Sequence, residues 1–247
     1  RFALAFPDVY EIGMSHAGLK ILYSVLNAME DIWAQRVFAP WFDLANAMEE
    51  NGLELVTLES RQPVKTCDVV GFSLLYELSY SSLVRMLKLA GIPIYAAARS
   101  AGDPLVIAGG PCVSNPMPVL PFLDAVVLGD GEETIQDIAA VCRQTPNRDE
   151  RLAALAELEG VLVPGRTAKP RRRILSDLDK YPFPTDCPVP NAGIVHDRLG
   201  VELARGCTRG CRFCQAGVIY RPYREHGFKT AVDTYENGLK QTGYDEV

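Results

Sequence analysis

Val69-Val-Gly-Phe-Ser-Leu-Leu75 is a short, mainly apolar run whose length and composition predict a buried strand. Similar runs lie on both sides of it, at Phe2–Phe6, Leu53–Leu58, Leu105–Ala108 and Ala125–Leu128. Stretches with apolar residues at helical spacing separate them, at Ala17–Met29, Trp41–Asn51, Ser79–Ala90 and Glu132–Arg143. This alternation predicts an α/β domain with a doubly wound parallel sheet of the flavodoxin or Rossmann type.

The first domain is expected to end with a short helix at Leu152–Glu159 and a short strand at Gly160–Val163, which places it at residues 1–163. Residues 164–198 are rich in proline and basic side chains, a composition that predicts a linker. Its run Arg171-Arg172-Arg173 favours a solvated connector over a site for nucleic acid or an acidic partner.

The last part of the chain, residues 199–247, contains a predicted strand at Leu199–Ala204 and a predicted helix at Gly227–Gln241. We expect this pair to begin a partial (β/α) barrel, with the loop after the strand at its carboxyl end. The chain opens inside a strand and stops before such a barrel is complete. We therefore expect it to be the N-terminal portion of a longer protein.

The composition restricts the class of protein. A hydrophobic content of 48% and a charged content of 23% are typical of a soluble globular protein. The net charge of −6 argues against a general affinity for the nucleic-acid backbone. No apolar run approaches membrane-spanning length and no targeting segment is visible. A cytoplasmic protein that does not bind membranes is expected.

The segment Cys207-Thr-Arg-Gly-Cys211-Arg-Phe-Cys214 places three cysteines on one short loop. Thiolates are soft ligands that select iron–sulfur clusters, and three of them can hold three corners of a cubic cluster. The fourth iron then stays open to a small molecule. The spacing therefore predicts a [4Fe-4S] site at Cys207, Cys211 and Cys214.

A zinc site and a disulfide framework are the alternative interpretations of the cysteines. A structural zinc site usually has four ligands, and the nearby candidates for a fourth are Cys187 and His226. A disulfide framework is disfavoured because the seven cysteines are an odd number in a chain large enough to have a core. The cysteines with apolar neighbours are expected to be small buried hydrophobes: Cys67, Cys112 and Cys142.

The cysteine spacing, with Phe213 before the last cysteine, resembles the signature of the radical S-adenosylmethionine (SAM) superfamily. The resemblance implies that SAM chelates the open iron, that Phe213 packs near its adenine, and that one electron cleaves SAM to a 5′-deoxyadenosyl radical. It also implies an electron donor such as flavodoxin or ferredoxin. Catalytic residues beyond the cluster ligands are unknown from this chain.

The loops after the predicted strands resemble the cobalamin-binding domain that often precedes a radical barrel. The family pattern is D-x-H-x-x-G, then S-x-L, then G-G. Here the first element reads Asp8-x-Tyr10-x-x-Gly13, so a tyrosine replaces the cobalt-ligating histidine. The later elements match in order, and a further glycine loop follows the fifth predicted strand. The resemblance thus implies a cobalamin pocket formed by Asp8, Tyr10, Gly13, Ser73, Leu75, Gly109, Gly110, Gly129, Gly131 and Glu132. Tight turns in a flavodoxin-like domain are the alternative.

More narrowly, the chain resembles an uncharacterised branch marked by Pro7-Asp-Val-Tyr-Glu-Ile-Gly-Met-Ser15 and by Arg205-Gly-Cys through Gln215-Ala-Gly217. The leading hypothesis is a radical SAM enzyme that uses cobalamin for methyl transfer or rearrangement. A second is a radical SAM enzyme whose first domain binds substrate or a partner without cobalamin. A third is a non-catalytic iron–sulfur protein for electron transfer or sensing. A cluster with an open corner argues against the third.

Overall fold

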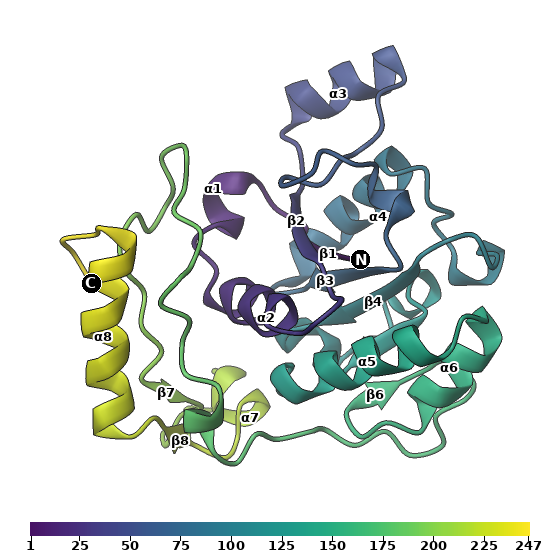
Figure 1. Ribbon diagram of the computed structural model, residues 1–247. Helices are drawn as coiled ribbons and strands as arrows, with labels where there is room; N and C mark the ends of the chain where they lie inside the picture. The colour runs from purple at the N-terminus through teal and green to yellow at the C-terminus, as the bar shows by residue number, and fades with distance from the viewer.

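The computed structural model describes residues 1–247 and is built around a six-stranded sheet with the order β2-β1-β3-β4-β5-β6 (Figure 1). Neighbouring strands from β2 to β5 run parallel, and only β6 is antiparallel. This confirms the predicted α/β fold with a mainly parallel sheet. The strands are β1 (Phe2–Phe6), β2 (Ala34–Phe38), β3 (Val69–Ser73), β4 (Leu105–Gly109), β5 (Ala125–Val127) and β6 (Val161–Leu162).

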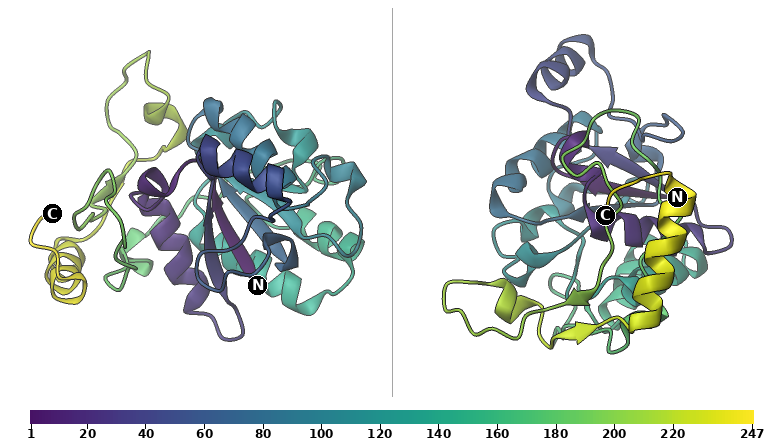
Figure 2. Two further views of the ribbon diagram at one scale, coloured as in Figure 1. Left: turned by 90° about the horizontal axis from the view of Figure 1, so that it is seen from above. Right: turned by 90° about the vertical axis from the view of Figure 1, so that its left-hand side faces the viewer.

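Helices cover both faces of the sheet, as a doubly wound fold requires (Figures 1 and 2). One face packs against α2, α5 and α6, and the other packs against α4, with α3 beyond it. The helices of this part are α1 (Tyr10–Gly13), α2 (Ala17–Asn27), α3 (Phe42–Asn51), α4 (Tyr80–Leu89), α5 (Glu132–Gln144) and α6 (Arg148–Ala156).

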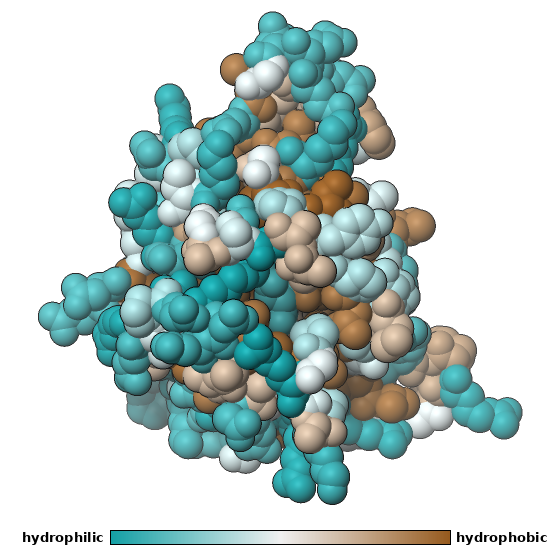
Figure 3. Space-filling model, turned by 90° about the vertical axis from the view of Figure 1, so that its right-hand side faces the viewer, coloured by the Kyte–Doolittle hydropathy of each residue, from teal (hydrophilic) through white to brown (hydrophobic).

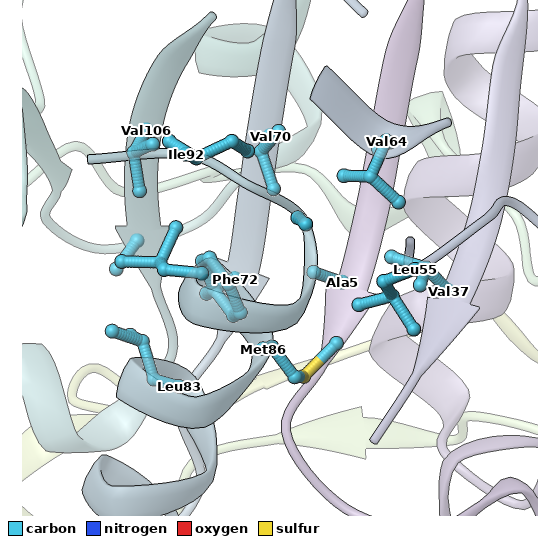
Figure 4. Packing of buried hydrophobic residues seen from close by; sticks show 14 of the residues in the cluster. Ala5, Val37, Leu55, Val64, Val70, Phe72, Leu83, Met86, Ile92 and Val106 are labelled. Atoms are coloured by element: carbon cyan, nitrogen blue, oxygen red, sulfur yellow. The ribbon is translucent and has the colours of Figure 1, made fainter. Parts of the chain in front are cut away.

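Two apolar cores, one on each face, hold the layers together. Figure 4 shows Phe72 of β3 near Leu83 and Met86 of α4, and Val70 of the same strand near Ile92 and Val106. Leu83 is fully shielded from solvent, and burying a leucine side chain contributes about 1.5–3 kcal/mol. Strands that are buried on both faces explain why their sequences are continuously apolar.

The predicted strand at Leu53–Leu58 is wrong. This segment makes only an isolated bridge, between Val56 and Pro63. Leu53 and Leu58 are 58% and 42% exposed, so the apolar residues here do not mark a buried strand. The strand that occupies the edge beside β1 is β2.

The sequence pattern missed β2 because this strand carries polar residues at Gln35 and Arg36. Tertiary contacts make those residues acceptable there. Buried Gln35 accepts a hydrogen bond from Thr57 at 2.8 Å, and Arg36 forms an ion pair with Glu59 at 2.7 Å. Thr57 and Glu59 therefore lie beside β2 and satisfy its polar side chains.

The last part of the chain contains a two-stranded antiparallel sheet of β7 (Ala204–Arg205) and β8 (Arg224–Glu225), with α7 (Ala216–Ile219) between them and α8 (Phe228–Thr242) after them. The helix expected at Gly227–Gln241 is confirmed as α8. The strand expected at Leu199–Ala204 is not, because only its last residue pairs, and it pairs with an antiparallel strand. A barrel strand needs parallel neighbours. The start of a barrel is therefore not shown.

The basic run of the linker is not a solvated connector throughout. The backbone of Arg173 runs parallel to Gly129, and its side chain forms ion pairs with Glu133 and Asp137. Arg172 donates hydrogen bonds to backbone carbonyls after the cysteine loop. The linker thus packs along the carboxyl end of β5.

No helix is long and apolar enough to cross a membrane. Figure 3, which views the side opposite the C-terminal helix, shows apolar patches broken up by polar side chains.

Candidate functional site

A cavity of about 700 Å³ lies at the carboxyl ends of β3, β4 and β5. In open α/β sheets this edge is where ligands bind. The residues that line the cavity come from the strand ends, from the start of α2, from the loop between β5 and α5, from the linker, and from the stem of the cysteine loop. The volume is that of an ordinary small-molecule site.

Two glycines in the sheet form the floor of this cavity, because they have no side chain to fill the space above the strands. Gly71 of β3 lies in register between Leu4 of β1 and Ile107 of β4. A Cβ atom at Gly71 would meet Ile107 at an ordinary contact distance of 3.6 Å, and one at Gly109 would meet Val127 at 3.6 Å. The floor of the cavity is therefore recessed because these two residues are glycines, and not because the strands are separated.

Seven of the predicted cobalamin-pocket residues line the cavity together: Ser73, Leu75, Gly109, Gly110, Gly129, Gly131 and Glu132. They come from three successive loops that are distant in sequence. Gly110 has a positive φ of 102°, and a Cβ there would lie 2.5 Å from the carbonyl oxygen of Leu74. A glycine is therefore required for the close approach of the two loops.

The other three predicted residues, Asp8, Tyr10 and Gly13, do not line the cavity. The Asp8 carboxylate accepts hydrogen bonds from the amide of Val9 and from the hydroxyl of Tyr76. The Tyr10 hydroxyl accepts a hydrogen bond from the amide of Asn191 in the linker at 3.0 Å. These residues fasten the loop after β1 to its surroundings, so the structure does not bring them together with the other seven.

His16 lines the cavity, and the predicted pocket did not include it. It is the N-cap of α2, where its Nδ1 accepts a hydrogen bond from the amide of Leu19 at 3.0 Å. The neutral ring then carries its proton on Nε2, which has no lone pair to offer a metal. Burial, with a smaller effect of Lys20, lowers the pKa of His16 to about 4. The capping role explains this histidine.

His16 predicts a pH dependence of stability. Its pKa is lower in the folded protein, so the unfolded chain takes up the proton first, and stability present above pH 6.5 is lost as the pH falls towards about 4. We expect His16→Asn, which keeps a capping oxygen, to remove about 3 kcal/mol of this loss. Urea unfolding of both proteins at several pH values between 7 and 4 measures it. Parallel profiles would contradict the assignment.

Arg205 joins the cavity to the stem of the cysteine loop. Its guanidinium forms ion pairs with Asp130 at 2.9 Å, with Glu132 at 2.7 Å and with Glu202 at 2.8 Å. Burial opposes the charge of Arg205, but hydrogen bonds to Glu202 and Glu132 outweigh it and raise its pKa. Asp130 also pairs with Arg224. Burial opposes its charge too, yet hydrogen bonds from Arg205 and Arg224 hold the pKa of Asp130 below its usual value.

The cysteine loop stands out from the body of the molecule (Figure 2). Cys207 and Cys214 are half-buried, Cys211 is exposed, and Phe213 is 92% exposed. All seven cysteines are free thiols. The three loop thiols are not drawn together here, and no group of three His, Cys, Asp or Glu side chains has the geometry of a metal site.

The base of the loop is closed by Gly206, which has a φ of 97° and lies so close to Tyr220 that a Cβ would be 2.6 Å from its carbonyl oxygen. Arg205, Gly206 and Tyr220 all line the cavity. The residue before Cys207 is therefore part of the cavity wall. This shared wall is what joins the two predicted sites.

The cysteines outside the loop are buried or half-buried, and the candidate fourth zinc ligand His226 has a hydrogen-bond partner. Cys67 and Cys112 are buried as predicted, and Cys142 is half-buried against the core of the α5 face. Burial raises the pKa of Cys142 and of Cys187 to about 11, so both remain neutral thiols. The Nδ1–H group of His226 donates a hydrogen bond to the Asp179 carboxylate at 3.1 Å.

Residues 18–164 match the family described as radical SAM proteins, N-terminal. This match covers more than half of the chain. The chain belongs to this family. Residues 18–164 are thus the N-terminal part of a radical SAM protein.

Among curated proteins, the uncharacterised protein MJ0966 of Methanocaldococcus jannaschii is 23% identical over an alignment of 249 positions. The alignment covers 99% of this chain and 47% of MJ0966. The anaerobic magnesium-protoporphyrin IX monomethyl ester cyclase of Cereibacter sphaeroides is 27% identical over 136 residues, which cover 50% of this chain and 21% of the cyclase. The chain thus spans less than half the length of either relative.

Among solved structures, the radical SAM methyltransferase TsrM of Kitasatospora setae superposes with a TM-score of 0.62 in its form with cobalamin and a [4Fe-4S] cluster bound. The identity is 14%, and the match covers 98% of this chain and 46% of TsrM. Its form with tryptophan substrate and the analogue aza-SAM gives a TM-score of 0.61 at 15% identity. The likeness shows a shared fold.

Proposed function

We propose that this chain is the N-terminal portion of a radical SAM enzyme that binds a [4Fe-4S] cluster on its cysteine loop and a cobalamin in the cavity. Cys207, Cys211 and Cys214 would ligate the cluster, and Phe213 would pack near the adenine of SAM. When bound, these groups supply the radical and methyl-transfer or rearrangement chemistry. An external flavodoxin or ferredoxin would supply electrons.

The observation that carries the proposal is the shared wall of the cavity and the cysteine loop. Arg205 and Gly206 line the cavity and directly precede Cys207. A ligand in the cavity therefore lies against the stem of the thiol loop. TsrM, which has the same fold over this region, binds both cobalamin and a [4Fe-4S] cluster.

The residues present suit a cobalamin without a histidine ligand to cobalt. Tyr10 stands where the family motif has its histidine, and it lies outside the cavity. His16 lines the cavity, but its Nδ1 lone pair is used by the cap of α2. We expect bound cobalamin to show a visible spectrum without histidine ligation.

A different observation favours a second candidate. Because Asp8, Tyr10 and Gly13 lie apart from the other pocket residues, the cavity of a radical SAM enzyme could hold a substrate or part of a partner instead of cobalamin. Anaerobic titration of the purified protein with hydroxocobalamin, followed by desalting, separates the two. Retention of about one cobalamin per chain supports the first candidate, and no retention supports the second.

A variant tests whether the cavity is the cobalamin site. Gly71→Ile adds a side chain at the recessed floor of the cavity. Isoleucine has a high β-propensity and is therefore suited to a strand position. We expect the affinity for hydroxocobalamin to fall at least about tenfold, with the far-ultraviolet circular dichroism unchanged. Gly193→Ile, at an exposed position with open space around it, is the control. Equal affinity of both variants would place the ligand elsewhere.

A further inference from the structure

The cavity wall contains a buried carboxylate in which only one of the two oxygens has a hydrogen-bond partner. Glu132, the first residue of α5, is 3% exposed and lines the cavity. Its Oε1 accepts a hydrogen bond from Nη2 of Arg205 at 2.7 Å. Its Oε2 is buried and has no hydrogen-bond partner. A buried carboxylate oxygen without a donor is unfavourable, so its position calls for a partner.

Three of the arginine side chains that line the cavity are engaged with other groups. The guanidinium of Arg205 donates hydrogen bonds to Asp130, to Oε1 of Glu132 and to Glu202. Arg224 donates to Asp130 and to a backbone carbonyl, and Arg173 pairs with Glu133 and Asp137. A donor for Oε2 must therefore come from outside these side chains. Because Glu132 lines the cavity, a ligand held there is in position to bring one.

We propose that Glu132 is a specificity-determining residue of the cavity, whose Oε2 accepts a hydrogen bond from a hydroxyl or amide N–H group of the ligand. This inference rests on the proposed function. Cobalamin carries such donors in two places, the hydroxyl groups of its nucleotide tail and the amide groups around its corrin ring.

Glu132→Gln tests the proposal with little change of shape. The glutamine oxygen is expected to face Arg205, because the opposite orientation would point an amide N–H group at a guanidinium. Its Nε2 then replaces Oε2 and presents a donor where the ligand also presents one. We expect the dissociation constant for hydroxocobalamin to rise roughly 10- to 100-fold, as for a lost hydrogen bond to a charged group.

The matched control is Glu133→Gln, which makes the same change of charge at the next residue. Glu133 pairs with Arg173 and does not line the cavity. Its affinity for hydroxocobalamin is expected to equal that of the unchanged protein. Circular dichroism and thermal unfolding of both variants check that the fold is intact. A parallel titration with cobinamide, which lacks the nucleotide tail, identifies the donor.

Weaker binding of cobalamin alone by Glu132→Gln assigns the donor to the tail, and equal weakening for cobinamide assigns it to the corrin amides. Either result supports the proposal. Unchanged affinity in a folded Glu132→Gln protein, or an equal loss in Glu133→Gln, overturns it and leaves the proposed function standing. Failure of the unchanged protein to bind either corrinoid overturns the proposed function, and this inference with it.

Discussion

Cys211→Ala is expected to abolish both cluster binding and the reductive cleavage of SAM. Three thiolates hold three corners of the proposed cluster, and loss of one leaves two irons without protein ligands. After anaerobic reconstitution, the iron content should fall from about four per chain to less than one. Iron and sulfide analysis, together with electron paramagnetic resonance of the dithionite-reduced protein, measures the change.

Cys142→Ala is the control for this experiment. Cys142 is a half-buried thiol on α5 and takes no part in the cysteine loop, so its removal should leave the iron content unchanged. An intact four-iron cluster in Cys211→Ala would refute the ligand assignment. Zinc in place of iron in the unchanged protein, lost on substitution of Cys187 or His226, would instead establish the structural zinc alternative.

Arg205→Met is expected to cause the largest loss of stability among the substitutions considered. The side chain of Arg205 is only 14% exposed, and the Glu132 side chain it neutralises is 3% exposed. Removing one partner of a buried ion pair leaves an uncompensated charge, which destabilises by about 3–5 kcal/mol. Asp130 keeps Arg224 as a partner, so Glu132 bears most of the penalty.

Urea unfolding at neutral pH measures this effect. Arg209→Met, an exposed arginine on the cysteine loop itself, serves as the control and should change stability by less than about 0.5 kcal/mol. Hydrogen exchange should show loss of protection at β7, β8 and the loop between β5 and α5 before the rest of the sheet. A loss below about 1 kcal/mol would mean that the network contributes little, as exposed ion pairs do.

The order of strands and helices could be predicted where burial follows a local pattern. β1, β3, β4 and β5 are continuously apolar, and α2 to α5 have apolar residues at helical spacing. The pattern failed at β2, where Gln35 is buried only because Thr57 donates a hydrogen bond to it. It failed again at Leu199–Ala204, where apolar residues suggested a parallel strand that has no parallel partner.

The candidate site shows the same division. Ser73 and Gly109 were predicted from motifs, and Gly129 and Glu132 from the glycine loop that follows the next strand; all four line the cavity because parallel strands bring those ends to one edge. Asp8 and Tyr10 were assigned to the same pocket by motif alone, yet their hydrogen bonds hold them outside it. No local pattern indicated His16 as a cap or the linker as part of the wall.

The α/β class, the family and the three thiols that we propose as cluster ligands follow from the amino-acid sequence, since each depends on patterns along the chain. That Arg205 joins the cavity to the cysteine loop, and that Glu132 is left with one unpaired oxygen, follows from the fold. Those features depend on which distant segments meet, and on the burial that makes an ion pair strong and an unpaired oxygen costly. Burial of that kind is a property of the assembled chain.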